Sequence, residues 1–142
     1  MNPYQNSAYQ KYKEEAVYNM SPVELLLLLY DEAIKDLKKG KFSLEDKDYE
    51  GFELYIDKTT RIIRYLMKTL DCSQPMSVDL RRLYDFILYD FGRMKAGRAK
   101  YIGEFDAIIE IIQNLRDGFD GAAKKLGPNG DTHVVKEKRI LG

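Results

Sequence analysis

Apolar residues recur every three or four positions along most of this chain, and no stretch alternates apolar and polar positions with a period of two. The first pattern is typical of amphipathic helices and the second of half-buried strands. We therefore predict four helices, over residues 22–40, 48–70, 77–97 and 104–126. The first helix either ends near Gly40 or resumes as far as residue 46.

Capping residues mark the start of the first helix. Ser21 is a favoured N-cap, Pro22 suits the first helical position, and Glu24 completes a capping box. Stop signals follow the second and fourth helices, at residues 71–75 and 127–130. Four amphipathic helices with short connections predict an all-α fold, an antiparallel four-helix bundle.

Composition divides the chain into three predicted parts: an N-terminal arm over 1–20, the bundle over 21–127, and a flexible C-terminal tail over 128–142. The arm is polar and rich in tyrosine, and its tyrosines are Tyr4, Tyr9, Tyr12 and Tyr18. A tyrosine ring can pack on an apolar surface while its hydroxyl stays in water. We expect the arm to be a removable cover for such a surface.

The first helix carries more apolar surface than one side of a bundle core requires. At about 100° per residue, one face collects the apolar positions 23, 26, 27, 30, 34 and 37. Leu25, Leu28 and Leu29 then point to the opposite side. A helix in a four-helix bundle shows only part of its circumference to the core. We therefore expect another segment to cover these three leucines.

The third helix repeats this excess with aromatic residues. Its core stripe runs through positions 80, 83, 84, 87 and 91, whereas Phe86 and Tyr89 lean away from that stripe. Contiguous apolar surface on a small protein usually marks a protein interface. The alternative is that the arm or a second copy of the chain completes the core.

Composition excludes much catalytic chemistry. The chain has 142 residues, equal numbers of acidic and basic residues, one histidine and one cysteine. His133 alone provides no multi-histidine metal site, and Cys72 alone provides no disulfide framework or Cys-x-x-Cys motif. A single cysteine fits a reducing cytoplasm. The longest apolar run is too short to span a bilayer, so we expect no membrane insertion.

One basic run suggests a nucleic-acid interface. It contains Arg93, Lys95, Arg98 and Lys100 without an acidic residue, and basic clusters can bind phosphate backbones. A solvated helix end, favoured by the helix dipole, explains the same residues more simply. Because net charge is also zero, we expect no nucleic-acid partner.

Several peptides, in this order and spacing, resemble the flagellin-specific export chaperones of bacterial flagella. The resemblance covers residues 2–126, with Phe119 where that family often has tryptophan. The peptides are Asn2-Pro3-Tyr4, Ala8-Tyr9-Gln10, Met20-Ser21-Pro22-Val23-Glu24-Leu25, Leu29-Tyr30-Asp31-Glu32-Ala33-Ile34, Leu83-Tyr84-Asp85-Phe86 and Leu115-Arg116-Asp117-Gly118-Phe119.

The resemblance implies a cytoplasmic chaperone without enzyme activity or cofactor. Such a protein binds the disordered C-terminal segment of flagellin, prevents its premature polymerisation, and assists delivery to components of the flagellar export gate. Together with the surplus apolar surface, it predicts a set of partner-binding residues: Tyr4, Tyr9, Tyr12, Leu25, Leu28, Leu29, Phe86 and Tyr89. A purely structural alternative remains, in which the same surface joins two copies in a homodimer when the protein is free.

Overall fold

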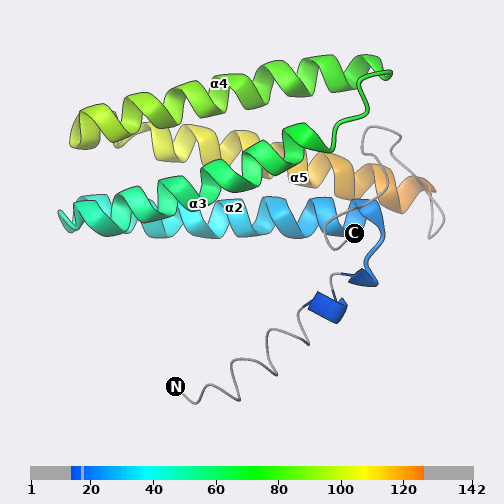
Figure 1. The fold of residues 1–142 in the computed structure, drawn as a ribbon, viewed down its shortest axis with the longest axis horizontal. Helices are drawn as coiled ribbons and strands as arrows, with labels where there is room; N and C mark the ends of the chain where they lie inside the picture. The colour runs from blue at the N-terminus through cyan, green and yellow to red at the C-terminus, as the bar shows by residue number, and fades with distance from the viewer. Residues whose placement is uncertain (1–13, 17, 127–142) are drawn as a thin grey trace.

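A computed structural model describes residues 14–16 and 18–126, and within them four long helices follow one another. They are α2 (Pro22–Glu45), α3 (Tyr49–Lys68), α4 (Pro75–Gly97) and α5 (Glu104–Leu126), with a short 3-10 helix, η1 (Arg98–Tyr101), between the last two. The long helices lie side by side, each antiparallel to the one before it (Figure 1). The predicted all-α bundle is confirmed. The predicted arm and tail lie largely outside the described residues, and their boundaries stay predictions.

Capping residues fix where the helices begin. The Ser21 Oγ accepts a hydrogen bond from the Glu24 backbone N–H at 3.2 Å, as the capping signal predicts. α3 begins in the same way at Asp48, whose carboxylate accepts from the Gly51 N–H at 3.0 Å. α4 begins at Pro75, slightly before its predicted start, because proline suits the first turn of a helix.

Gly40 lies inside α2 and does not end it. The helix continues unbroken to Glu45, and Gly40 is buried. A Cβ placed on Gly40 would lie 3.2 Å from the Phe105 ring and 3.2 Å from the Tyr55 Cβ. The missing side chain therefore lets α3 and α5 approach α2 closely. Of the two ends predicted for this helix, the later one is confirmed.

α2 is the central helix of the bundle. It packs closely along both α3 and α5, whereas α4 lies along α3 and approaches α5 at few points. All four helices contribute to one apolar core. Its largest fully buried side chains are Tyr30, Leu37, Phe52, Ile56, Ile63, Leu66, Tyr84, Ile87, Phe91, Met94, Phe105 and Ile108.

Both flanks of α2 are covered by neighbouring helices, so the prediction that Leu29 points to the side opposite the core was wrong. Leu29 is partly buried and packs against the core, as Leu27 does. Leu25 is only 5% exposed but is not part of the connected core cluster, so its partner-binding role stays a prediction. The helical-wheel argument gave α2 one buried face. Because α2 lies between α3 and α5, two of its sides are buried.

Two tyrosines join α2 to α4 inside the core. The hydroxyls of Tyr30 and Tyr84 share a hydrogen bond of 2.5 Å, and both side chains are almost completely buried. The Phe119 ring of α5 stacks on Tyr30 with the ring centroids 6.1 Å apart. Burial raises the pKa of both hydroxyls, that of Tyr84 to about 12. Each neutral hydroxyl therefore gives the other a hydrogen-bond partner inside the core.

Asp90 is a buried carboxyl without a matching donor. Its residue surface is fully buried, and within the described chain neither side-chain oxygen has a hydrogen-bond partner. The nearest cation is the Arg93 guanidinium, at 3.6 Å. Burial, together with the neighbouring Glu104 carboxyl of α5, raises the pKa of Asp90 to about 6, and Arg93 offsets this only in part. Native Asp90 thus retains its proton to a higher pH than the unfolded chain does.

Removing either core hydroxyl should destabilise the protein. We expect Tyr30→Phe and Tyr84→Phe each to lower the free energy of unfolding by about 1–3 kcal/mol, because each leaves the other hydroxyl buried and unpaired. The double variant should cost less than the sum of the single variants, since no unpaired hydroxyl remains. Urea titrations of the four proteins measure this coupling. Additive losses would show that the two hydroxyls do not stabilise each other.

Asp90→Asn should stabilise the protein in a pH-dependent way. Because folding raises the pKa of Asp90, its contribution to stability is present near pH 4 and is lost as the pH rises through about 6. The amide does not ionise, so between pH 4 and pH 7 the variant should gain about 2–3 kcal/mol of stability relative to the wild type. Denaturant titrations at pH 4 and pH 7 test this. The exposed Asp79→Asn on the same helix is the control, and equal gains from both variants would contradict the role of burial.

Candidate functional site

The outer side of α4 carries two exposed aromatic side chains. Phe86 is 48% exposed and Tyr89 is 67% exposed. They lie one helical turn apart, so they form a continuous surface. The prediction that both residues lean away from the core is confirmed.

This aromatic surface continues toward α5. Asp90 and Glu104 face each other across the two helices. Leu83 precedes Asp90 on α4 by as many residues as Ile111 follows Glu104 on α5. Because the two helices are antiparallel, Leu83 and Ile111 lie at the same level along the bundle. Leu83, Ile111 and Leu115 are partly buried and rest against the core. We name the whole surface the α4–α5 strip, and it consists of Leu83, Phe86, Tyr89, Ile111 and Leu115.

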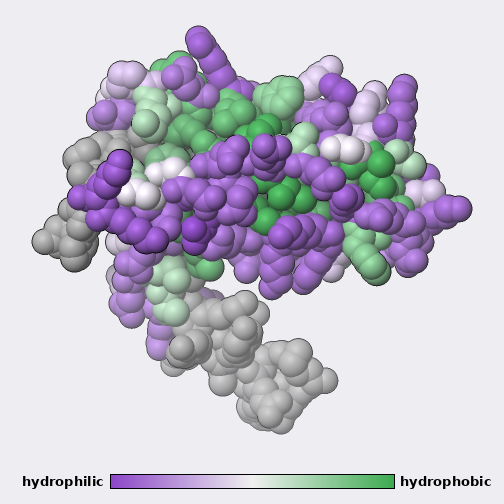
Figure 2. Space-filling model, turned by 180° about the vertical axis from the view of Figure 1, so that it is seen from behind, coloured by the Kyte–Doolittle hydropathy of each residue, from purple (hydrophilic) through white to green (hydrophobic). Residues whose placement is uncertain are grey.

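The α4–α5 strip is accessible because the two helices approach each other only sparsely. Figure 2 shows hydrophobic surface gathered where α4 runs beside α5, next to a hydrophilic band. Beyond Leu115, Gly118 adds open space, since a Cβ placed there would have no atom within 4 Å other than those of its chain neighbours and of the adjoining α5 backbone. An apolar segment of another chain could therefore lie along the strip without displacing a side chain of α5 at this position.

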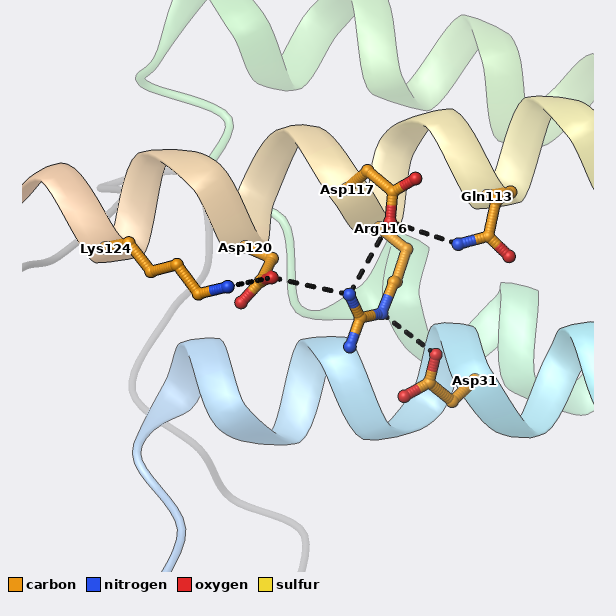
Figure 3. A network of polar contacts seen from close by, with 6 residues as sticks. All are labelled: Asp31, Gln113, Arg116, Asp117, Asp120 and Lys124. Carbon is orange, nitrogen blue, oxygen red and sulfur yellow. Dashed lines mark hydrogen bonds and ion pairs between the residues drawn. The ribbon is translucent and has the colours of Figure 1, made fainter.

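The opposite side of α5 is closed by polar contacts with α2 (Figure 3). The Arg116 Nε donates to the Asp31 carboxylate of α2 at 3.0 Å, and its guanidinium also lies 3.4 Å from Asp120 and 3.5 Å from Asp117. Lys124, 3.0 Å from Asp120, together with Arg116 holds the pKa of that carboxyl below its ordinary value. α5 thus has one side tied to α2 by charge and another side that presents apolar residues beside α4.

The remaining predicted partner-binding residues are not in one place. Leu28 and Leu29 are half-buried on α2, whereas Phe86 and Tyr89 are on α4, and α2 and α4 occupy opposite corners of the bundle. Leu25 is buried on α2. The three arm tyrosines of the predicted set, Tyr4, Tyr9 and Tyr12, lie outside the described residues.

The basic run at the end of α4 and in η1 makes its contacts within the chain. Lys95 pairs with Asp57 of α3 at 2.8 Å. The Arg93 guanidinium lies 4.8 Å from the centre of the Tyr101 ring, and that of Arg98 lies 4.2 Å from the centre of the Tyr49 ring. The remaining cation of the run, the Lys100 ammonium, lies 5.6 Å from the centre of the Tyr101 ring. These residues therefore hold the α4–η1 connection in place, which is a structural explanation for the run.

A metal site and a membrane span are not found among the described residues. These residues contain no group of three or more metal-ligating side chains, and none of their helices is long and apolar enough to cross a membrane. Cys72 is an exposed free thiol in the connection between α3 and α4. Sequence analysis missed Phe42, the most exposed large apolar side chain among these residues at 72%. The sequence shows a phenylalanine after Gly40, but the predicted end of the first helix was left open there, so Phe42 was not assigned to a helix face.

Comparisons with known proteins agree with this architecture. A family model described as Flagellar protein FliS matches residues 4–126. The flagellar secretion chaperone FliS of Bacillus subtilis (strain 168) is 28% identical over 124 residues, which cover 80% of this chain and 92% of that protein. A crystal structure of a flagellar chaperone from bacteria has a TM-score of 0.68 at 24% identity, covering 85% of this chain and 98% of that chain, and so shares the fold. The chain belongs to the FliS family of flagellar secretion chaperones, a family of chaperones and not of enzymes.

Proposed function

We propose that this flagellar export chaperone binds the disordered C-terminal segment of flagellin in the cytoplasm. Binding would prevent premature polymerisation and keep the segment available for delivery to the export gate. The observation that carries the proposal is the α4–α5 strip, an exposed apolar surface on a member of a flagellar chaperone family. A client without a folded core can supply apolar residues to such a surface.

An amphipathic helix is the client structure that fits the strip best. Phe86 and Tyr89 are spaced by one turn along α4, and Ile111 and Leu115 are spaced by one turn along α5. A helix with apolar residues at matching intervals would contact both rows at once. Folding the segment on binding costs conformational entropy, which burial of its apolar face must exceed.

Burial of apolar side chains should contribute more to the affinity for the client than attraction between charges does. Complete burial of a large apolar side chain contributes about 1.5–3 kcal/mol, and the strip offers several that are exposed or partly exposed. The exposed charged neighbours Arg82 and Asp85 have opposite signs, so they provide no strong field of one sign. Client affinity should therefore depend weakly on salt.

The predicted partner-binding residues outside the strip have other roles in this proposal: contact with a further part of the client, and cover of apolar surface in the free protein. Leu28 and Leu29 remain half-buried on α2 and could contact a further part of a long client. The arm tyrosines Tyr4, Tyr9 and Tyr12 would cover apolar surface in the free protein and yield to the client. A cover of this kind lowers the apparent affinity by the fraction of protein in the open state.

A homodimer through the same strip is the competing proposal. It would cover Phe86 and Tyr89 in the free protein, so that client binding would require the dimer to separate. The two proposals differ in the oligomeric state of the free chain across a range of concentrations. Sedimentation experiments distinguish them, since a monomer at all concentrations leaves the strip open for the client.

Substitution of the strip should weaken client binding without unfolding the bundle. We expect Phe86→Ser with Tyr89→Ser to lower the affinity for a synthetic flagellin C-terminal segment by more than tenfold, because two apolar contacts are lost. The measurement is titration calorimetry, with circular dichroism to record the helix gained by the segment. Binding of the wild type should show a negative heat-capacity change, the sign of apolar burial.

Leu54→Ser on α3 is the matched control, because Leu54 is 50% exposed and Phe86 is 48% exposed. It should leave client affinity unchanged. Equal affinities of the strip variant and the wild type, with both proteins folded, would overturn the assignment of the strip. A wild-type chain that does not bind the segment at all would overturn the proposed function.

A further inference from the structure

A second apolar surface lies between the C-terminal half of α2 and the N-terminal half of α3. Phe42, the most exposed large apolar side chain among the described residues, borders an open hollow of about 350 Å³. The other lining residues are Lys38, Lys39, Ser43 and Tyr55. We name this surface the Phe42 hollow.

The charged residues that line the hollow are both lysines. The Lys39 ammonium lies 5.9 Å from the centre of the Tyr55 ring, and the Lys58 ammonium lies 5.5 Å from the same centre. In the described part of the chain, none of Lys38, Lys39 and Lys58 forms an ion pair with a carboxylate. Their positive charges therefore remain available to a partner.

Acidic residues nearby offset this charge only partly. Asp36 lies within reach of Lys58, Lys39 and Lys35, but it is almost buried, and burial followed by the nearby Glu32 raises its pKa. It therefore presents little carboxylate surface to an incoming chain. The rim of the hollow thus combines an exposed aromatic ring with exposed ammonium groups.

We propose that the Phe42 hollow binds an acidic peptide segment with an aromatic or leucine side chain as its anchor. The anchor would pack on the Phe42 ring and the Tyr55 ring, while glutamates or aspartates on either side would pair with Lys38, Lys39 and Lys58. Charge complementarity selects this occupant over a neutral or basic segment. An apolar centre with charged contacts around it is the usual anatomy of a protein interface.

The hollow is separate from the α4–α5 strip. It is formed by α2 and α3, whereas the strip is formed by α4 and α5. The chaperone could therefore hold a client and an acidic partner at the same time. This inference does not depend on flagellin being the client.

The test uses the full chain and a fluorescein-labelled synthetic peptide with one phenylalanine and one leucine among glutamates. Anisotropy titrations should show saturable binding that weakens as salt is added. We expect Phe42→Ser to weaken binding about tenfold through loss of the anchor contact. Lys38→Glu combined with Lys39→Glu should weaken it at least as much, because repulsion replaces attraction.

Matched controls lie on α4. Met76→Ser replaces a residue that is 55% exposed, and Arg81→Glu reverses an exposed charge, so neither should change binding of the peptide. A comparison peptide with lysines in place of glutamates should not bind. Equal binding of both peptides, equal loss in the control variants, or no saturable binding would each overturn the inference.

Competition with the flagellin segment separates this inference from the proposed function. A saturating flagellin segment should leave binding of the acidic peptide unchanged, and Phe86→Ser with Tyr89→Ser should do the same. Displacement of the peptide by flagellin would overturn the claim of an independent site. If flagellin does not bind but the acidic peptide does, the inference stands while the proposed function fails.

Discussion

The hydrogen bond between Tyr30 and Tyr84 sets the orientation of α4, on which the exposed surface depends. It joins helices at opposite corners of the bundle, deep in the core. With Tyr84 pointing inward, Phe86 lies about 200° and Tyr89 about 140° further around the helix, at about 100° per residue. Both must then face outward. The polar contact that closes the core therefore also presents an aromatic surface to a partner.

α5 gives that surface its second row of residues. Its side toward α2 is held by Arg116 and the carboxylates around it, which are hydrophilic and mutually satisfied (Figure 3). Its side toward α4 carries Ile111 and Leu115, and α4 approaches α5 at few points. A bundle with all four sides packed equally would have no such strip. Uneven packing lets a stable fold keep apolar surface available for a client.

Much of the fold could be predicted because its signals are local. The Ser21 cap, the period of apolar residues and the breaks after residues 70 and 126 depend on neighbouring positions, and they gave four helices and most of their ends. The pattern also placed Tyr30 and Tyr84 in the core and Phe86 and Tyr89 outside it, as the structure shows. Partner binding by these residues stays a prediction.

What sequence reasoning missed depends on contacts between distant segments. Leu29 packs against the core because α2 has neighbours on two flanks, and no local pattern states how many neighbours a helix has. Gly40 resembles a stop signal, but the proximity of Phe105 and Tyr55 explains it. The role of Asp90 depends on Glu104 of another helix. In each case the deciding residue lies on a different helix.

The central claim is that the client lies along the outer side of α4 beside α5. Site-specific photo-crosslinking tests it most directly, with a photoreactive phenylalanine analogue placed at the position of Tyr89 or, as the comparison, at the position of Phe42. Both positions are more than half exposed, so access alone does not favour either of them. We predict that the flagellin C-terminal segment crosslinks from the Tyr89 position and not from the Phe42 position. Crosslinking only from the Phe42 position would contradict the claim.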